Sequence, residues 1–177
     1  GGANEIIELL PVEEIAPAHV ADVVRQSGAR DVIYKVVFRE QDTVEPISPG
    51  DEFELQDYYD HPEKYRSKFD TYLPHLTLLV NCVYWEEKYP RLVTKESLRE
   101  LYRGTRQPRL RVIGDASCDI EGAIEATVKC TEPGNPVYVY DPFENRAIDG
   151  VAVRGPVILA VDILPSELPR EASTYFS

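Results

Sequence analysis

Two kinds of hydrophobic pattern alternate along this chain. Residues 77–84 (TLLVNCVY) form a nearly continuous apolar run, and residues 110–114 and 157–162 repeat the pattern. Short continuous runs of this kind are typical of strands that are buried on both faces, as in a parallel sheet. We therefore predict three central parallel strands at these positions, with Asp115 directly after the second.

Helically spaced apolar residues separate these strands. The pattern predicts helices over residues 3–10, 17–25, 62–73, 94–103 and 169–176. Thr94 is predicted as the N-cap of the helix over 94–103, and Gly104 is predicted as its C-cap. Further strands are predicted at residues 12–15, 31–38 and 137–140, the last in an excursion from the sheet.

The alternation of strands and helices predicts an α/β fold. We expect a Rossmann-like, doubly wound and mostly parallel sheet formed by one partial domain over residues 1–177. Gly1-Gly2 ahead of a helix is typical of the end of a glycine-rich loop that follows a strand. We therefore expect the sheet to lack its first strand. A long polar connection over about residues 41–63 is predicted as an insertion, with one short helix near Tyr58.

Composition excludes several classes of function. The net charge of -12 argues against binding to nucleic acid or to an anionic membrane surface. No apolar stretch approaches the roughly 18 residues that span a bilayer. The three cysteines and three histidines show no metal-binding or disulfide spacing, so we expect an intracellular protein without a metal. The chain contains no Met and begins with Gly1-Gly2, which predicts a piece of a longer polypeptide.

Polar residues follow each of the three buried strands. Asn81 ends the first, residues 115–119 (DASCD) follow the second, and Asp162 ends the third. Ligands bind at the carboxyl ends of strands in doubly wound sheets, so we expect these side chains to line one crevice.

Each candidate also has a structural interpretation. Asn81 would satisfy backbone groups of a loop, and Asp115 and Asp119 would cap a helix that begins near Gly122. Tyr84 and Trp85 would pack rather than stack on a ligand, and Cys82 would be a small buried apolar residue, with a Cys82–Cys118 pair as an alternative. Two histidines are likewise expected to be structural rather than catalytic, His61 as a surface residue and His75 as a core residue.

Five segments taken together resemble one enzyme family. They are residues 2–11 (GANEIIELLP), 57–65 (DYYDHPEKY), 81–92 (NCVYWEEKYPRL), 113–125 (IGDASCDIEGAIE) and 162–172 (DILPSELPREA). They resemble the lysine-ketoglutarate reductase region of the bifunctional alpha-aminoadipic semialdehyde synthases. Lysine-forming saccharopine dehydrogenases look like shorter relatives, and the C-terminal domain of alanine dehydrogenases looks like a more distant one.

The resemblance implies a reaction and a cofactor. The family condenses lysine with 2-oxoglutarate to saccharopine in lysine degradation, as an NADP-dependent oxidoreductase acting on a CH–NH group. Its catalytic Lys and His lie in an N-terminal domain that this chain lacks, so no catalytic residue is expected here and the chain alone should be inactive. An intracellular location, cytoplasmic or mitochondrial, and a homo-oligomer are further expectations.

The resemblance also assigns binding residues. Tyr84 would lie beside the adenosine part of the cofactor, Ala116 and Ser117 beside the nicotinamide half, and Asp119 on the substrate side. The full set expected to bind cofactor is Gly2, Tyr84, Ala116, Ser117, Val161, Asp162, Ile163 and Leu164.

The chain departs from the family pattern at two places. Ala16 stands where an acidic residue would hold the ribose hydroxyls, which favours NADP(H) over NAD. Glu121-Gly122 stands where the family pattern has Gly-Gly. Two rivals to the enzyme interpretation remain: a structural or self-association module on the same core, and an alanine-dehydrogenase-like or transhydrogenase-like module.

Overall fold

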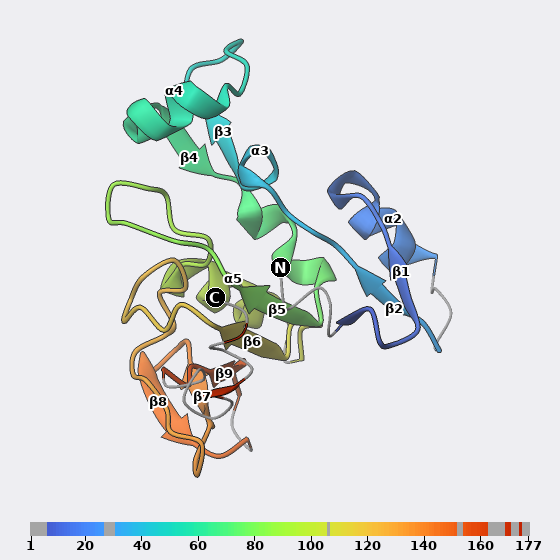
Figure 1. Cartoon of the computed structure of the whole chain (residues 1–177), viewed down its shortest axis with the longest axis vertical. Coiled ribbons are helices and arrows are strands. Elements are labelled where there is room, and N and C mark those ends of the chain that lie inside the picture. The colour runs from blue at the N-terminus through green and yellow to red at the C-terminus, as the bar shows by residue number, and fades with distance from the viewer. Residues whose placement is uncertain are drawn as a thin grey trace. The chain divides into compact units, whose positions relative to one another are not determined.

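The computed structural model divides the chain into two compact units, Gly1–His75 and Leu76–Ser177 (Figure 1). The structure describes residues 7–26, 31–105, 107–151, 154–162, 169–170 and 174. Each unit has its own sheet structure, and each is described by itself below.

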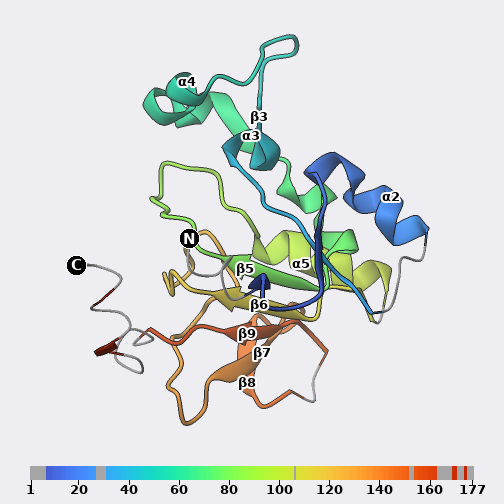
Figure 2. The same cartoon turned by 45° about the vertical axis from the view of Figure 1, so that its right-hand side comes forward.

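A five-stranded mixed sheet organises the second unit. Its strands are β5 (Leu78–Asn81), β6 (Val112–Asp115), β7 (Val137–Asp141), β8 (Arg146–Asp149) and β9 (Val157–Leu159). They are arranged in the order β5-β6-β9-β7-β8, and β5, β6 and β9 are parallel to one another. β7 is antiparallel to both β9 and β8. Figures 1 and 2 both show β5, β6 and β9 side by side.

Apolar side chains from this sheet form the core of the unit. Ile113 of β6, Val139 of β7 and Ile158 of β9 are completely buried. Burial of this kind, at about 25 cal/mol for each Å² of apolar surface, is the main force that holds the strands together. Tyr138 is also completely buried, and its hydroxyl group accepts a hydrogen bond from Val128 N and donates one to Ala126 O, both at 3.0 Å.

Helix α5 (Lys95–Gly104) connects β5 to β6. Thr94 is its N-cap and forms a capping box with Ser97, which satisfies backbone N–H groups of the first turn. Leu98 and Tyr102 form the buried face, and the Tyr102 hydroxyl donates to Leu110 O at 2.9 Å. The helix therefore holds the segment that leads into β6.

The first unit contains two small sheets. Strands β1 (Val12–Glu14) and β2 (Ile33–Lys35) are parallel, and η1 (Pro17–His19) and α2 (Val20–Arg25) lie between them in the chain. Strands β3 (Val44–Pro46) and β4 (Tyr65–Ser67) are antiparallel. The other elements are α3 (Glu40–Thr43), α4 (Leu55–Asp60), η2 (Pro62–Lys64), η3 (Phe69–Thr71) and η4 (Leu73–His75).

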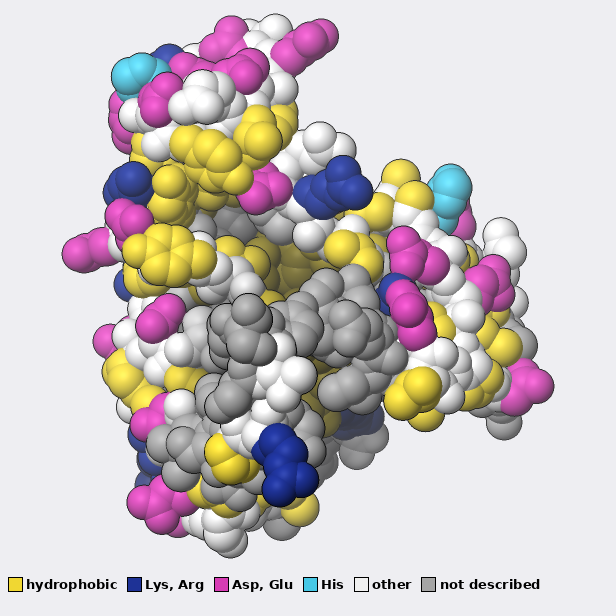
Figure 3. All heavy atoms as spheres, viewed as in Figure 1, with side chains coloured by type: hydrophobic (Ala, Val, Ile, Leu, Met, Phe, Trp, Pro, Cys, Tyr) yellow, Lys and Arg dark blue, Asp and Glu magenta, His cyan; other side chains and the backbone are white. Residues whose placement is uncertain are grey.

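A hydrogen-bonded carboxylate joins α4 to β4. Asp57 accepts from Lys64 Nζ at 2.6 Å and from the Tyr65 hydroxyl at 2.9 Å. These contacts, led by the Lys64 hydrogen bond, lower the pKa of Asp57. Residues 57–65, one of the five family segments, therefore connect α4 to β4 within this unit. Figure 3 shows hydrophobic side chains gathered at the surface of the part that carries α4 and β4.

The structure confirms an α/β fold with a mostly parallel arrangement of the main strands. The predicted strands at 12–15, 31–38, 77–84, 110–114 and 157–162 are all present in shortened form, and so are the helices over 17–25 and 94–103 and the short helix that contains Tyr58. Of the helix predicted over 3–10, only Ile7 is described as helical. Of the one over 169–176, Pro169, Arg170 and Thr174 are helical, and the other residues lie outside the described ones.

Four predictions about elements were wrong. Residues 62–73 form 3-10 turns and β4 rather than one helix, because Tyr65–Ser67 pairs with β3. Among the described strands β5 lies at an edge of its sheet rather than at the centre, and Leu78 and Val80 are 55% and 44% exposed. Residues 137–141 are no excursion but a strand of the main sheet. Gly104 is the last helical residue of α5, and Thr105 is the C-cap.

Candidate functional site

The carboxyl ends of β5, β6 and β9 meet at one edge of the sheet. Asn81 is directly opposite Asp115 in the parallel register, and Gly114 is opposite Leu159. The sequence prediction that these three strand ends are neighbours is confirmed. We call this the carboxyl edge, and we define it by the residues that end or follow the three strands: 81–85, 115–119 and 159–162.

A buried polar network occupies the base of this edge. Asp115 is completely buried, and its Oδ1 accepts from Asn81 Nδ2 at 2.8 Å and from Ser117 Oγ at 2.8 Å. Its Oδ2 accepts from Thr127 Oγ1 at 2.6 Å. Asn81 also donates to Ser117 Oγ at 3.3 Å and accepts from Val83 N at 3.2 Å. The network thus joins the end of β5 to the loop after β6.

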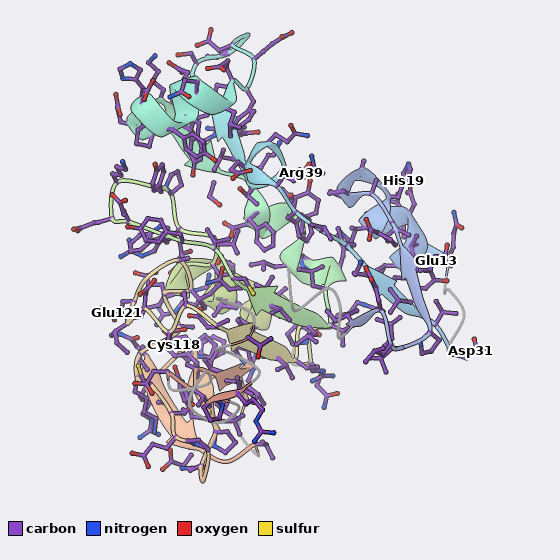
Figure 4. The ribbon with its side chains drawn as sticks, in the orientation of Figure 1. Glu13, His19, Asp31, Arg39, Cys118 and Glu121 are labelled. Carbon is purple, nitrogen blue, oxygen red and sulfur yellow. The ribbon has the colours of Figure 1, made fainter. Side chains whose placement is uncertain are left out.

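The loop that follows β6 has an unusual backbone. Cys118 and Glu121 both have left-handed φ angles, of 56° and 51°, which non-glycine residues rarely adopt. A Cβ atom on Gly122 would lie 2.5 Å from Asp119 Cβ, so this position requires glycine. The turn is therefore tight, and Figure 4 shows Cys118 and Glu121 on it.

Two basic residues contact the part of this loop around Glu121. One precedes α5, and the other is the first residue of α5. Arg91 donates from Nε and Nη2 to Glu121 O, at 3.2 Å and 3.0 Å. Lys95 Nζ forms an ion pair with the Glu121 carboxylate, which lowers the pKa of Glu121. Lys95 N also donates to Glu125 Oε2 at 2.8 Å. These contacts fix residues 121–125 to the segment before α5 and to its first residue.

Acidic side chains gather around the Cys118 thiol at the carboxyl edge. The pKa of the Cys118 thiol is raised to about 11, mainly by burial and further by the nearby Asp115, Cys130, Asp162 and Asp119. A neutral thiol is favoured there because a thiolate would meet several negative groups. A phosphate group would meet the same repulsion, so this edge suits uncharged or cationic parts of a ligand.

The predicted binding residues differ in what they can offer. Tyr84 is 82% exposed, and Ala116, Asp119 and Asp162 are also exposed. Val161 is buried and forms a parallel bridge with Thr131, so its side chain faces the core. Gly2, Ile163 and Leu164 lie outside the described residues.

Several structural interpretations are now decided. Asp115 and Asp119 do not cap a helix near Gly122, because residues 120–129 form turns and irregular structure. Asn81 bonds to a loop backbone group, as its structural interpretation predicted, and to Asp115 as well. Cys82 is exposed rather than buried, and Cys82 and Cys118 are both free thiols.

Of the two aromatic residues after β5, one packs against the protein and the other has a ring exposed to solvent. Trp85 Nε1 donates to Tyr89 O at 3.1 Å, and Arg91 lies 5.0 Å from the centre of its ring. Trp85 therefore packs within its own loop, as the structural interpretation predicted. Tyr84 does not pack in this way, and its exposed ring is open to a planar ligand.

Sequence reasoning missed three residues of this site. Thr127, Arg91 and Lys95 contact the loop after β6 across 12 to 30 positions of sequence. Nothing in the local pattern around Thr127 indicates that its hydroxyl would meet a buried carboxylate. Arg91 stood within one of the family segments, but its contact with a backbone carbonyl depends on the fold.

No group of three or more His, Cys, Asp or Glu side chains in the part of the chain that the structure describes is arranged to hold a metal ion. Within the same residues, no helix combines the length and the apolar character that crossing a membrane requires.

The parallel strands and the polar side chains at their carboxyl ends place this chain among the α/β proteins. The carboxyl edge is its candidate ligand site. No protein-family model matches the chain. Over 99% of its length, the chain is 34% identical to alpha-aminoadipic semialdehyde synthase of Arabidopsis thaliana. Over the same share of the chain, it is 31% identical to the mitochondrial alpha-aminoadipic semialdehyde synthase of Bos taurus. Over 56% of its length it is 34% identical to the saccharopine dehydrogenase [NAD(+), L-lysine-forming] of Schizosaccharomyces pombe.

These relatives confirm the resemblance inferred from the five segments. Over nearly its whole length, the chain is homologous to a segment of alpha-aminoadipic semialdehyde synthase. It covers 17% of the Arabidopsis relative and 20% of the bovine one, so the chain spans about a fifth of the length of the curated relatives that it matches.

Proposed function

We propose that this chain is the cofactor-binding part of a lysine-ketoglutarate reductase, which forms saccharopine from lysine and 2-oxoglutarate in lysine degradation. The observation that carries the proposal is the carboxyl edge of β5, β6 and β9, where Asn81, Asp115 and Ser117 form one network in a chain homologous to these enzymes. The doubly wound Rossmann arrangement over the whole chain, without its first strand, is part of the same proposal.

The charges at the carboxyl edge indicate which part of NADP(H) it would hold. The carboxylates of Asp115, Asp119 and Asp162 disfavour a phosphate, whereas a nicotinamide ring, neutral when reduced and cationic when oxidised, meets no repulsion. Ser117 and backbone groups of the loop after β6 would orient the nicotinamide half, and the exposed ring of Tyr84 would stack on a base. When bound, the nucleotide supplies the hydride.

Gly2, the residue that the resemblance assigns to cofactor binding near the start of the chain, lies outside the described residues. Ala16 supports the preference for NADP(H). It is exposed, follows β1 by two residues and carries no carboxylate that would repel a 2'-phosphate. Asp119, also exposed, would face the substrate side.

Energy transfer from the single tryptophan tests this proposal directly. Trp85 lies one residue beyond Tyr84, so bound NADPH should accept its excitation energy and emit in the reduced-nicotinamide band. We expect Tyr84→Ala to weaken NADPH binding about tenfold, which is the usual contribution of an aromatic stacking contact. Tyr59→Ala, which removes a partly exposed tyrosine of α4, is the matched control and should leave the affinity unchanged. No transfer in the wild-type chain would refute nucleotide binding near β5.

The proposal includes an absence of turnover by the chain alone. The resemblance places the proton-transfer residues in a domain outside these residues, so the chain should bind nucleotide without forming saccharopine. Incubation with lysine, 2-oxoglutarate and NADPH, followed by detection of saccharopine, tests this expectation. Product formation by the pure chain would contradict it. An intracellular location, in the cytoplasm or in mitochondria as for the bovine relative, belongs to the same proposal.

A second candidate function is self-association. It is favoured by β5, a strand at an edge among the described strands, whose Leu78 and Val80 side chains are 55% and 44% exposed. An unpaired apolar edge is a template for strand pairing with another copy. Light scattering of the wild-type chain and of Val80→Lys distinguishes the outcomes. A dimer that the lysine disrupts would support self-association, and a monomer in both would exclude it.

A further inference from the structure

Asp115 is an unusual residue for the end of a buried strand. Its side chain is completely buried, and its four hydrogen-bond donors are the Asn81 amide, the Ser117 hydroxyl, the Ser117 backbone N–H at 3.2 Å and the Thr127 hydroxyl. All four donors are neutral, and none of the ion pairs among the described residues involves Asp115. Burying a carboxylate without a cation is unfavourable unless hydrogen bonds replace its hydration.

These hydrogen bonds converge from three separate parts of the unit. Asn81 ends β5, Ser117 lies two residues after β6, and Thr127 lies further along the same loop. The Thr127 backbone also closes the loop, because its carbonyl oxygen accepts from Glu121 N at 2.8 Å. Asp115 Oδ1 thus fixes the start of the loop to the neighbouring strand, whereas the part of the loop near Thr127 is also held by this backbone hydrogen bond.

The loop needs such a restraint because its backbone is strained. Cys118 adopts a left-handed φ of 56°, a conformation that is unfavourable for a residue with a side chain. Its thiol donates to Asp115 O at 3.1 Å. The hydrogen bonds of Asp115 and of this thiol offset part of the cost of the left-handed conformation.

We propose that Asp115 is a positioning residue, which holds the segment Ala116–Asp119 in the conformation that receives the nicotinamide half of the cofactor. This inference rests on the proposed nucleotide-binding function. Asp115 itself is completely buried and acts through Ser117 and the loop backbone, whereas Ala116 and Asp119 are exposed.

The substitution Asp115→Asn tests the role of the charge while it preserves the volume. Oδ1 accepts three of the four hydrogen bonds, and these are strengthened by the carboxylate charge. The matched control is Thr127→Val, which removes the single donor to Oδ2 and leaves the Asn81 and Ser117 contacts in place. Asp115→Asn keeps an acceptor at Oδ1 but weakens these hydrogen bonds, and Thr127→Val removes one, so both variants should have lower melting temperatures.

Two readouts separate positioning from general stability. The first is NADPH affinity by titration. The second needs no nucleotide: it is the labelling rate of Cys118 by a thiol reagent, divided by the thiolate fraction of Cys118 in each variant, because the Asp115 charge also contributes to the pKa of this thiol. It is measured in a background with Cys82→Ser and Cys130→Ser, which leaves Cys118 as the one cysteine. We expect Asp115→Asn to weaken NADPH binding and to speed Cys118 labelling, each about tenfold, the usual effect of losing a charge-assisted hydrogen bond. Thr127→Val should change each by less than about twofold, because the contacts at Oδ1 remain.

Equal effects of both variants on both readouts would overturn the proposal and leave Asp115 a purely structural residue. A wild-type chain that binds no NADPH, with Cys118 labelling still accelerated in Asp115→Asn alone, would refute the proposed function but support loop positioning. Unchanged labelling in that case would overturn both. If Asp115→Asn does not fold, Asn81→Ala removes one Oδ1 donor and should change the same readouts in the same direction.

Discussion

At the scale of single residues, Gly155, two residues before β9, lies close against the backbone of β7. A Cβ atom at this position would overlap the carbonyl oxygen of Tyr140 and would lie 2.9 Å from a methyl group of Val139. We expect Gly155→Ala to destabilise the protein by about 1–3 kcal/mol, the usual effect of overpacking. Gly134→Ala is the control, because nothing lies within 4 Å of a Cβ atom there. Thermal denaturation of both variants checks this, and equal melting temperatures would contradict it.

Buried tyrosines give a second prediction at the residue scale. Burial raises the pKa of Tyr102, Tyr138 and Tyr140 to about 12. In the unfolded chain the value is about 10, so their stabilising effect is fully present below about pH 10 and is lost as pH rises toward 12. Urea denaturation at increasing pH should show falling stability in that window. Constant stability, with all eleven tyrosines titrating near pH 10 in the folded protein by absorbance, would contradict the burial of these side chains.

The site residues show which chemistry could be predicted from sequence. Asn81, Asp115 and Asp162 were found because each directly follows a continuous apolar run, and the register of the sheet brings Asn81 and Asp115 together. The partners of Asp115 were not all predictable. The contact of Thr127 depends on how residues 119–127 fold back, and tertiary structure decides this rather than local pattern.

At the scale of elements, the N-terminus of α5 tests the local physics of the fold. Thr94 Oγ1 accepts from Ser97 N at 3.1 Å, and Ser97 Oγ accepts from Thr94 N at 3.1 Å. We expect Thr94→Ala to lower the free energy of unfolding by about 1 kcal/mol. Thr94→Ser keeps the hydroxyl and should stay close to the wild type in urea denaturation. Equal destabilisation by both would show that the hydroxyl is not the stabilising group.

Prediction succeeded where an element is specified by its own residues. The strands β5, β6 and β9 and the helix α5 carry long apolar patterns or a cap within their own sequences. The prediction of a helix over residues 62–73 failed because the apolar spacing there arises from a 3-10 turn, a strand and an aromatic cluster. Phe69 is completely buried, and its ring centre lies 4.9 Å from that of Phe38. From the apolar spacing alone, a residue buried in such a cluster cannot be distinguished from one on the buried face of a helix.

At the scale of the whole molecule, the α/β class could be predicted, but the division into two compact units could not. Such a division depends on which segments pack together in the folded chain. The hydrophobic pattern of a segment shows that one of its faces is buried, but not which other segment covers that face. The antiparallel position of β7 between β9 and β8 was likewise beyond prediction, because short strands of similar composition pair in either direction.

The central claim is that this chain binds NADP(H) and prefers it to NAD(H). Calorimetric titration with NADPH, NADH and NADP+ tests it most directly, in the wild type and in Ala16→Asp, with Ala16→Asn as the uncharged control. We predict that the wild type binds NADPH more tightly than NADH and that only the aspartate variant loses this preference, because its carboxylate would repel the 2'-phosphate. Binding of none of the three nucleotides by the folded wild-type chain would contradict the claim.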